Sequence, residues 1–138
     1  MSERIIQVAE FEERLAAICL GGAGSAFPRR LRDRHILYRT IIQPMDPSKK
    51  YTEEQVNDVL RQWRLDIGAC LDIDHVTLRR YLIDELYLTR EASGTAYVVN
   101  SAGRGFVEFE ESVVAIDPVT VIQSARDRAS ERKRMHSL

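Results

Sequence analysis

Apolar residues recur at helical spacing in several stretches of the chain, and polar segments rich in Gly and Pro separate these stretches. The first stretch predicts a helix from Ser2 to about Leu20, which the segment GGAGSAFP ends. A second helix is expected to start just after Pro28 and to end before QPMDPSKK. In the third stretch, Thr52 can cap a helix whose first turn holds two glutamates.

The fourth predicted helix lies in DIDHVTLRRYLIDELYLTRE, residues 72–91, and Asp74 can serve as its N-cap. With 3.6 residues per turn, a buried row of apolar residues turns Arg80 and Thr77 outward and leaves Arg79 and His75 at its flanks. The row consists of leucines at four-residue steps: Leu78, Leu82 and Leu86.

Two short runs rich in Tyr, Thr, Val and Leu follow, and the turn ASG between them predicts a β-hairpin. Helices followed by a hairpin are the order of a winged helix-turn-helix. After Asn100, the segment FVEFEESVVAI could be a strand or a short helix. Asp117 and Pro118 then begin a last helix, whose thin apolar stripe favours docking against a partner helix or fraying into solvent.

These elements predict a mainly α protein with a small β-hairpin, in which a winged helix-turn-helix core carries added N- and C-terminal helices. The expected division is an N-terminal helix and Gly-rich joint at 1–25, a winged-helix domain at 26–100, and a C-terminal extension at 101–138 with a helix from about 117. A length of 138 residues with 44% hydrophobic residues fits one compact domain with appendages.

The distribution of apolar and acidic residues indicates where in the cell the protein is located. No run of about 18 apolar residues is present to span a bilayer. The first twenty residues contain four glutamates, where a signal peptide needs an apolar core. We therefore expect a cytoplasmic protein with no membrane partner.

The net charge of −1 conceals an uneven distribution of charge. Residues 26–50 hold seven basic against two acidic residues, and residues 117–138 hold five against three. A solvated helix face explains such runs more often than a nucleic-acid site does. The sequence pI near 6.3 also lies below the range typical of dedicated DNA-binding domains.

The residues FPRR, YTEEQVNDVL, DHVTLRRYLIDELYLTRE and GTAYVV resemble a bacterial family known as a domain of unknown function, number two thousand and eighty-seven. Its members look like FP-x-[KR], YTE-x-[EQ]-VN-x-x-L and DH-x-TLRR-x-L-[VI]-D, followed by a hairpin, and they occur alone or fused to ArsR-like regulators. The resemblance covers about residues 27–99, and its most specific part is Asp74 to Arg80. It implies a winged-helix-like domain associated with transcriptional regulation, without an established ligand or reaction.

The functional hypothesis is binding of double-stranded DNA, with the fourth helix in the major groove. Arg80 and Thr77 would reach base edges or phosphates, and Arg79 and Arg90 would grip the backbone beside them. Four further arginines precede or begin the second helix and would give a steep salt dependence: Arg29, Arg30, Arg32 and Arg34.

A competing interpretation leaves the same residues without a ligand. Arg80 can pair with Asp84 four residues later, and Arg79 can tie its helix to Glu53 or Glu54. The second-helix arginines would then form a solvated face. The acids at 72, 74 and 84 would also repel phosphate from this surface.

The sequence gives less support to a metal site or to an enzyme active site. The segment DIDH lacks a second group of candidate ligands at a useful spacing, so no metal is expected. Cys19 and Cys70 lie far apart in apolar surroundings, which predicts buried free thiols and not a nucleophile. We expect no enzyme activity and no cofactor. The expected function is that of a transcription-regulator-type DNA-binding homodimer joined through its terminal helices, and the alternative is a winged-helix module that binds a protein partner.

Overall fold

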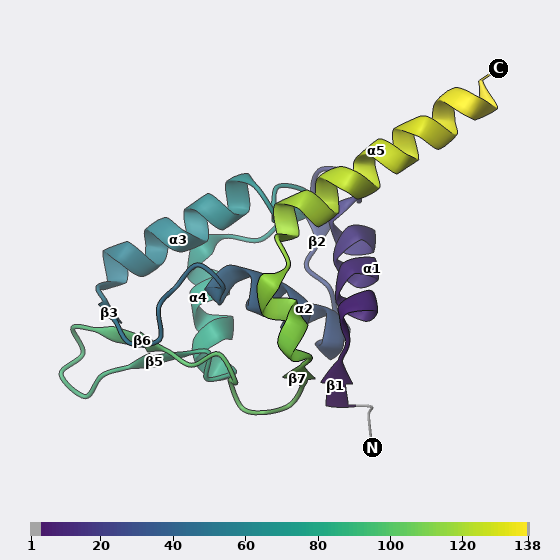
Figure 1. The fold of residues 1–138 in the computed structure, drawn as a ribbon. Coiled ribbons are helices and arrows are strands. Elements are labelled where there is room, and N and C mark those ends of the chain that lie inside the picture. The colour runs from purple at the N-terminus through teal and green to yellow at the C-terminus, as the bar shows by residue number, and fades with distance from the viewer. Residues whose placement is uncertain (1–3, 138) are drawn as a thin grey trace.

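The computed structural model describes residues 4–137, and the protein is mainly α-helical (Figure 1). Helix α3 packs against α4 and α2, α1 lies beside α2, and α5 crosses the top of α1. The helices are α1 (Val8–Cys19), α2 (Leu31–Ile42), α3 (Glu53–Leu65), α4 (His75–Asp84) and α5 (Pro118–His136).

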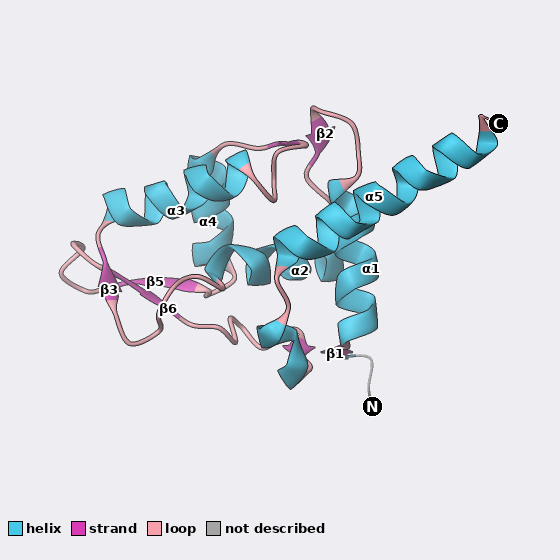
Figure 2. Ribbon diagram, turned by 45° about the horizontal axis from the view of Figure 1, so that its top comes forward, coloured by secondary structure: helices cyan, strands magenta, loops and turns pink. Residues whose placement is uncertain are grey.

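Short strands pair with one another at three places among the helices (Figure 2). β5 (Leu88–Arg90) and β6 (Tyr97–Val99) pair antiparallel, which confirms the predicted hairpin. β3 (Lys50–Tyr51), which was not predicted, adds to the other edge of β6 and gives the sheet order β3-β6-β5. Two parallel pairs join distant segments: β1 (Ile5–Ile6) with β7 (Glu108–Phe109), and β2 (Ser25–Ala26) with β4 (Leu71–Asp72).

Side-chain caps fix the starts of three helices where the sequence predicts them. Thr52 and Gln55 form a reciprocal capping box at α3. Asp74 accepts a 2.7 Å hydrogen bond from the backbone N–H of Thr77, and Asp117 caps α5 with Pro118 at its first turn. These starts are local properties of the sequence, and the predictions for them are confirmed.

Two predicted features are wrong. Ser2, the expected start of the first helix, lies outside the described residues, and the helix begins only at Val8 because Ile5–Ile6 pair as a strand with Glu108–Phe109. Leu86 does not extend the buried row of α4. The helix ends at Asp84, and Leu86 has a φ of 61° and is 40% exposed, so the left-handed turn carries its side chain away from the core.

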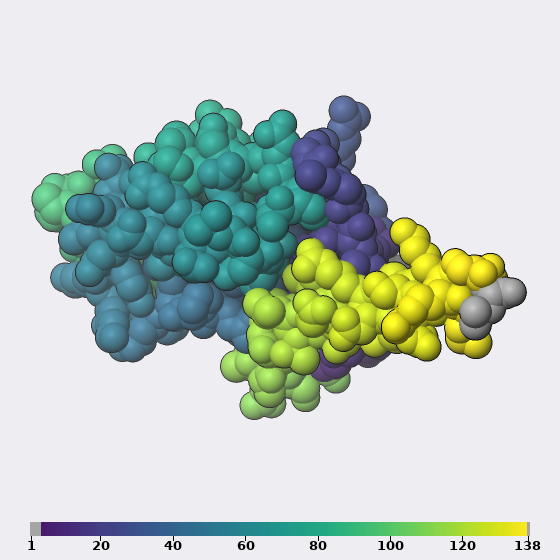
Figure 3. Space-filling model, turned by 90° about the horizontal axis from the view of Figure 1, so that it is seen from above, coloured from purple at the N-terminus to yellow at the C-terminus, as the bar shows by residue number. Residues whose placement is uncertain are grey.

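One cluster of buried side chains runs from Ile6 to Ile122. It includes residues of all five α-helices, and α5 reaches it through Ile122 while its C-terminal half extends away from the body (Figures 1 and 3). Cys19 and Cys70 are buried free thiols, as predicted. Burial raises the pKa of Cys19 to about 12, which leaves it protonated at neutral pH. Within residues 4–137, no helix combines the length and apolar character needed to cross a membrane.

Candidate nucleic-acid interface

An aromatic and arginine cluster joins the start of α2 to α4. The Arg34 guanidinium lies 5.1 Å from the ring centroid of Tyr81 and 5.5 Å from that of Phe27. The two rings themselves are 5.7 Å apart, and Arg34 Nε donates a 2.6 Å hydrogen bond to the carbonyl oxygen of Pro28. Stacking and the carbonyl contact therefore hold the Arg34 side chain toward α4.

Arg80 approaches the same ring from its own helix. Its guanidinium lies 5.9 Å from the Tyr81 centroid, and the residue is exposed, which is the orientation expected from Leu78 and Leu82. Among the described residues, Arg80 forms no ion pair with Asp84 or with another carboxylate. Arg34 and Arg80, which are far apart in the sequence, thus meet at Tyr81, with half-buried Thr77 one turn before it.

Arg79 points to the other side of α4. Its guanidinium donates a hydrogen bond to the Asn57 side-chain oxygen and lies 3.8 Å from Glu53 Oε1. The side chain is only 18% exposed. Arg79 therefore ties α4 to α3, as the competing interpretation expects, and does not join the cluster around Tyr81.

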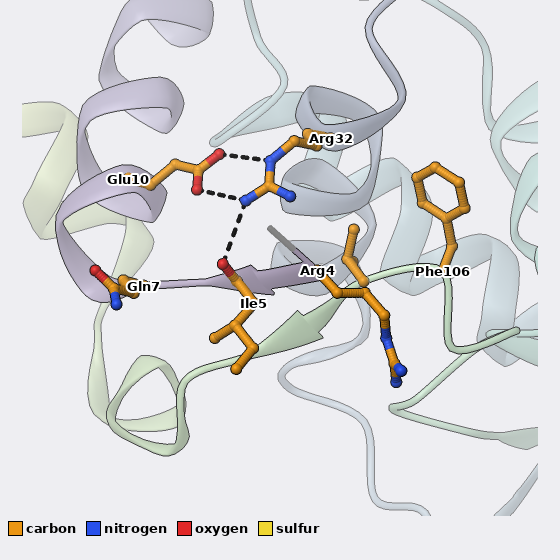
Figure 4. A pocket seen from close by; sticks show the side chains of 7 residues that line it. Arg4, Ile5, Gln7, Glu10, Arg32 and Phe106 are labelled. Atoms are coloured by element: carbon orange, nitrogen blue, oxygen red, sulfur yellow. Dashed lines mark hydrogen bonds and ion pairs between the residues drawn. The ribbon is translucent and has the colours of Figure 1, made fainter. Parts of the chain in front are cut away.

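Arg32 is also separated from that cluster. Its Nε and Nη2 donate hydrogen bonds of 2.8 and 2.6 Å to the two oxygens of Glu10 on α1 (Figure 4). The Arg32 Nη2 also reaches the Ile5 carbonyl oxygen at 3.3 Å. Figure 4 shows this pair at the wall of a groove that also includes Arg4 and Phe106. Arg29 and Arg30 are exposed just before α2, so the four arginines of this run do not share one face.

Arg90 lies on the hairpin. Its guanidinium is 5.9 Å from the Tyr97 ring centroid, and its Nε donates a 3.2 Å hydrogen bond to the carbonyl oxygen of Gly94 at the turn. The Tyr97 hydroxyl in turn donates to Glu53 on α3 at 3.4 Å. Arg90 is itself exposed, so the hairpin presents a cation beside its tip.

Carboxylates also lie around α4. Asp72, Asp74 and Asp84 are all exposed, and the hydrogen bonds from Thr77 lower the pKa of Asp74. The DIDH segment thus uses Asp74 as a helix cap. Within the described part of the chain, no group of three or more His, Cys, Asp or Glu side chains has a geometry that could hold a metal ion.

A buried polar cluster lies at the end of α4. His35 Nδ1 shares a 2.7 Å hydrogen bond with the Tyr87 hydroxyl, and His35 Nε2 lies 3.8 Å from Glu85 Oε2. The Phe106 ring stacks on the imidazole at 5.2 Å. Burial lowers the pKa of His35, although Glu85 opposes this shift, so the imidazole is neutral at neutral pH.

Sequence reasoning missed the two rings that organise the interface. Tyr81 follows Arg80 directly on the side of α4 away from Arg79, and Phe27 belongs to the FPRR motif. An aromatic residue next to an outward arginine was the available signal. Arg104 was missed as well: its Nε donates a 2.7 Å hydrogen bond to the Asp84 carbonyl oxygen, and this contact bridges twenty residues of sequence.

The model of a bacterial protein family, described as "Uncharacterized protein conserved in bacteria (DUF2087)", matches residues 25–99. The matched region runs from β2 to the end of β6 and includes every residue of the cluster around Tyr81. No match to the chain was found among curated proteins or among solved structures.

Proposed function

The chain belongs to this bacterial family, and from that premise we propose that it is a DNA-binding protein of the transcription-regulator type with a winged helix-turn-helix core. In this proposal, α2, α3 and α4 are the three helices of the core, and the β5–β6 hairpin is the wing. Helix α4 is the recognition helix that enters the major groove.

The strand arrangement supports a winged helix. β3 lies between the first two core helices in the sequence and pairs with β6, the second strand of the hairpin. This strand anchors the hairpin against the start of α3. The Tyr97 hydroxyl contact with Glu53 strengthens the same junction. A hairpin held in this way can lie beside the recognition helix and reach a neighbouring groove or the phosphate backbone.

The observation that carries the DNA-binding proposal is the meeting of Arg34 and Arg80 at Tyr81. Two guanidinium groups from different helices share one ring, next to the exposed side of α4. Guanidinium groups bind phosphate or guanine with paired hydrogen bonds, and stacking on an aromatic ring restricts them before binding. The arrangement therefore offers ordered cations at the helix proposed to enter the groove.

Each predicted residue receives a role in this proposal. Arg80 and Thr77 reach base edges or phosphates from α4, and Arg34 adds a cation at its flank. The exposed Arg29, Arg30 and Arg90 contact phosphates. Arg32 and Arg79 act as positioning residues, because their guanidinium groups are held by Glu10 and by the α3 side chains.

The alternative is a winged-helix module that binds a protein partner and not DNA. The exposed carboxylates of Asp72, Asp74 and Asp84 favour it, since they place negative charge around the helix that would approach phosphate. A partner with a basic surface would match these carboxylates.

A duplex-DNA titration at two salt concentrations tests the proposal, using the full chain, Arg80→Ala and the control Arg61→Ala, at an exposed position on α3. We expect wild type and Arg61→Ala to bind at low salt, and Arg80→Ala to bind more weakly with a salt slope smaller by about 0.9 for one lost phosphate contact. Failure of the wild type to bind duplex DNA at low salt, together with capture of a basic protein partner, would establish the alternative.

A further inference from the structure

An apolar groove lies on another part of the molecule. It lies where the end of α2, one side of α3 and the segment leading into α5 meet, and Figure 3 looks onto the side of the molecule where these segments lie. Its volume of about 690 Å³ falls within the range of small-molecule sites. None of the residues around Tyr81 lines it.

The walls of the groove are apolar. Trp63 and Ile67 line it from α3 and the turn that follows, and both are buried. Opposite them, Val114 and Val119 are 60% and 49% exposed, although they belong to a cavity wall. These apolar surfaces lose contact with water only when a molecule enters the groove, and that burial favours binding.

The groove has a fixed shape on both sides. The Trp63 indole donates a 2.9 Å hydrogen bond to the Thr40 hydroxyl on α2. Gly68 packs under the Trp63 ring so closely that a Cβ there would lie 2.3 Å from a ring carbon. Across the groove, Gln43 Nε2 donates to the carbonyl oxygens of Val114 and Ile116, at 3.1 and 2.9 Å. A ligand would therefore enter a largely preformed site.

The charges at the rim are of one sign. Asp58, Asp66 and Asp117 line the groove, and no Lys, Arg or His does so among the described residues. Asp58 has a partner in Arg61 at 3.5 Å, and Asp117 is the cap of α5. Asp66 is in no ion pair within residues 4–137. It is also the C-cap of α3, so its carboxylate adds to the negative end of the helix dipole.

We propose that this groove binds a small organic cation with an apolar, aromatic body. The body would lie against Trp63 and Val119, and the cationic centre would lie beside Asp66. Positive charge there offsets both the carboxylate and the C-terminal end of α3. The site is independent of the DNA-binding proposal, because it uses different residues and a different side of the fold.

Trp63 is the only tryptophan of the chain, so its fluorescence reports on the groove directly. The probes are tetraphenylphosphonium and tetraphenylborate, which share one shape and carry opposite charges. We expect a saturable change in Trp63 emission with tetraphenylphosphonium and a much weaker response to tetraphenylborate. Equal responses to both ions, or no saturable response to the cation, would overturn the proposal.

Variants of the full chain locate the binding. Asp66→Asn is expected to weaken tetraphenylphosphonium binding roughly threefold to fivefold, the effect of losing one exposed charge contact. Val119→Lys, at an exposed wall position, is expected to abolish binding by repulsion. The control Asp84→Asn, at an exposed position on α4, should leave binding unchanged, and an equal loss in this control would overturn the assignment of the site. Loss of the tetraphenylphosphonium response as the protein concentration rises would show that a second copy of the chain occupies the groove, and would also overturn the proposal.

Discussion

Arg34 of α2 stacks on Tyr81 of α4, with its guanidinium 5.1 Å from the ring centroid. This contact joins a helix start and a helix face that are separated by more than forty residues of sequence. Because Arg80 lies 5.9 Å from the same centroid, one ring sets the positions of two cations. The proposed interface therefore depends on Tyr81 as much as on the arginines.

Replacing the ring tests this dependence. Tyr81→Leu removes both cation–π contacts, each worth about 0.5–1 kcal/mol at an exposed site. We expect duplex-DNA affinity to fall several-fold in a fluorescence anisotropy titration. Tyr81→Phe retains the ring and should bind like the wild type. Equal losses in both variants would mean that the hydroxyl, and not the ring, matters.

The ion pair between α1 and α2 is expected to contribute to stability. Arg14 donates hydrogen bonds of 3.0 and 2.9 Å to the two carboxylate oxygens of Asp33, whose side chain is only 6% exposed. Arg14→Ala leaves this carboxylate without its partner, and we expect the free energy of unfolding in urea to fall by about 2 kcal/mol. Glu13→Ala, at an exposed neighbouring position, is the control. Similar free energies of unfolding for the two variants would show that the Arg14–Asp33 pair does not contribute to stability.

Acid should destabilise the fold through His35. Burial holds its pKa below the ordinary value of 6.5, so the unfolded chain takes up this proton first as the pH falls. The stability from this residue is fully present above 6.5 and is lost below it, by up to about 1.4 kcal/mol per pH unit.

Urea unfolding at a series of pH values measures this effect. His35→Gln can keep a hydrogen bond to Tyr87 but cannot titrate, so its stability should vary less with pH between 6.5 and the lowered pKa. His136→Gln, at an exposed position on α5, should behave like the wild type. An unchanged pH profile in His35→Gln would assign the acid sensitivity to other groups.

The C-terminal half of α5 is expected to form a homodimer contact. Residues 126–136 extend away from the body and are exposed except for half-buried Ala129 (Figure 1). A short helical segment with few buried residues is marginal in water, so a partner helix would stabilise it. Sedimentation equilibrium should give twice the 15.8 kDa chain mass. A chain that ends at Ala125 should be folded and monomeric, whereas a monomeric full-length chain would contradict the expectation.

Local signals in the sequence were sufficient to predict where three of the helices begin. Thr52, Asp74 and Asp117 cap helices through side-chain contacts within three residues, and these contacts depend little on the rest of the fold. The hairpin could also be predicted from neighbouring residues, because its two strands and their turn are adjacent in the sequence. Leu86 shows the limit of periodicity, because a leucine at the right spacing does not reveal that the chain has already turned into a left-handed conformation.

Long-range contacts could not be predicted in the same way. β1 consists of two apolar residues, Ile5 and Ile6, which fit a helix as well as a strand in the sequence. They form a strand because they pair with Glu108–Phe109, about a hundred residues later. Arg32 and Arg34 are two residues apart and look equivalent in the sequence. Their partners come from opposite sides of α2: Arg32 pairs with Glu10, and Arg34 stacks on Tyr81. Only these partners show that Arg32 is a positioning residue and that Arg34 is a candidate DNA contact.

The most direct test of the proposed interface is an NMR titration of the labelled full chain with duplex DNA at low salt. We expect the largest amide shift changes at Thr77, Arg80 and Tyr81 on α4, at Arg34, and at the hairpin turn, residues 92–95. Amides of α3 that face away from α4 should change little. Shift changes confined to α5, or none on α4 at saturating DNA, would contradict a DNA-reading role for this helix.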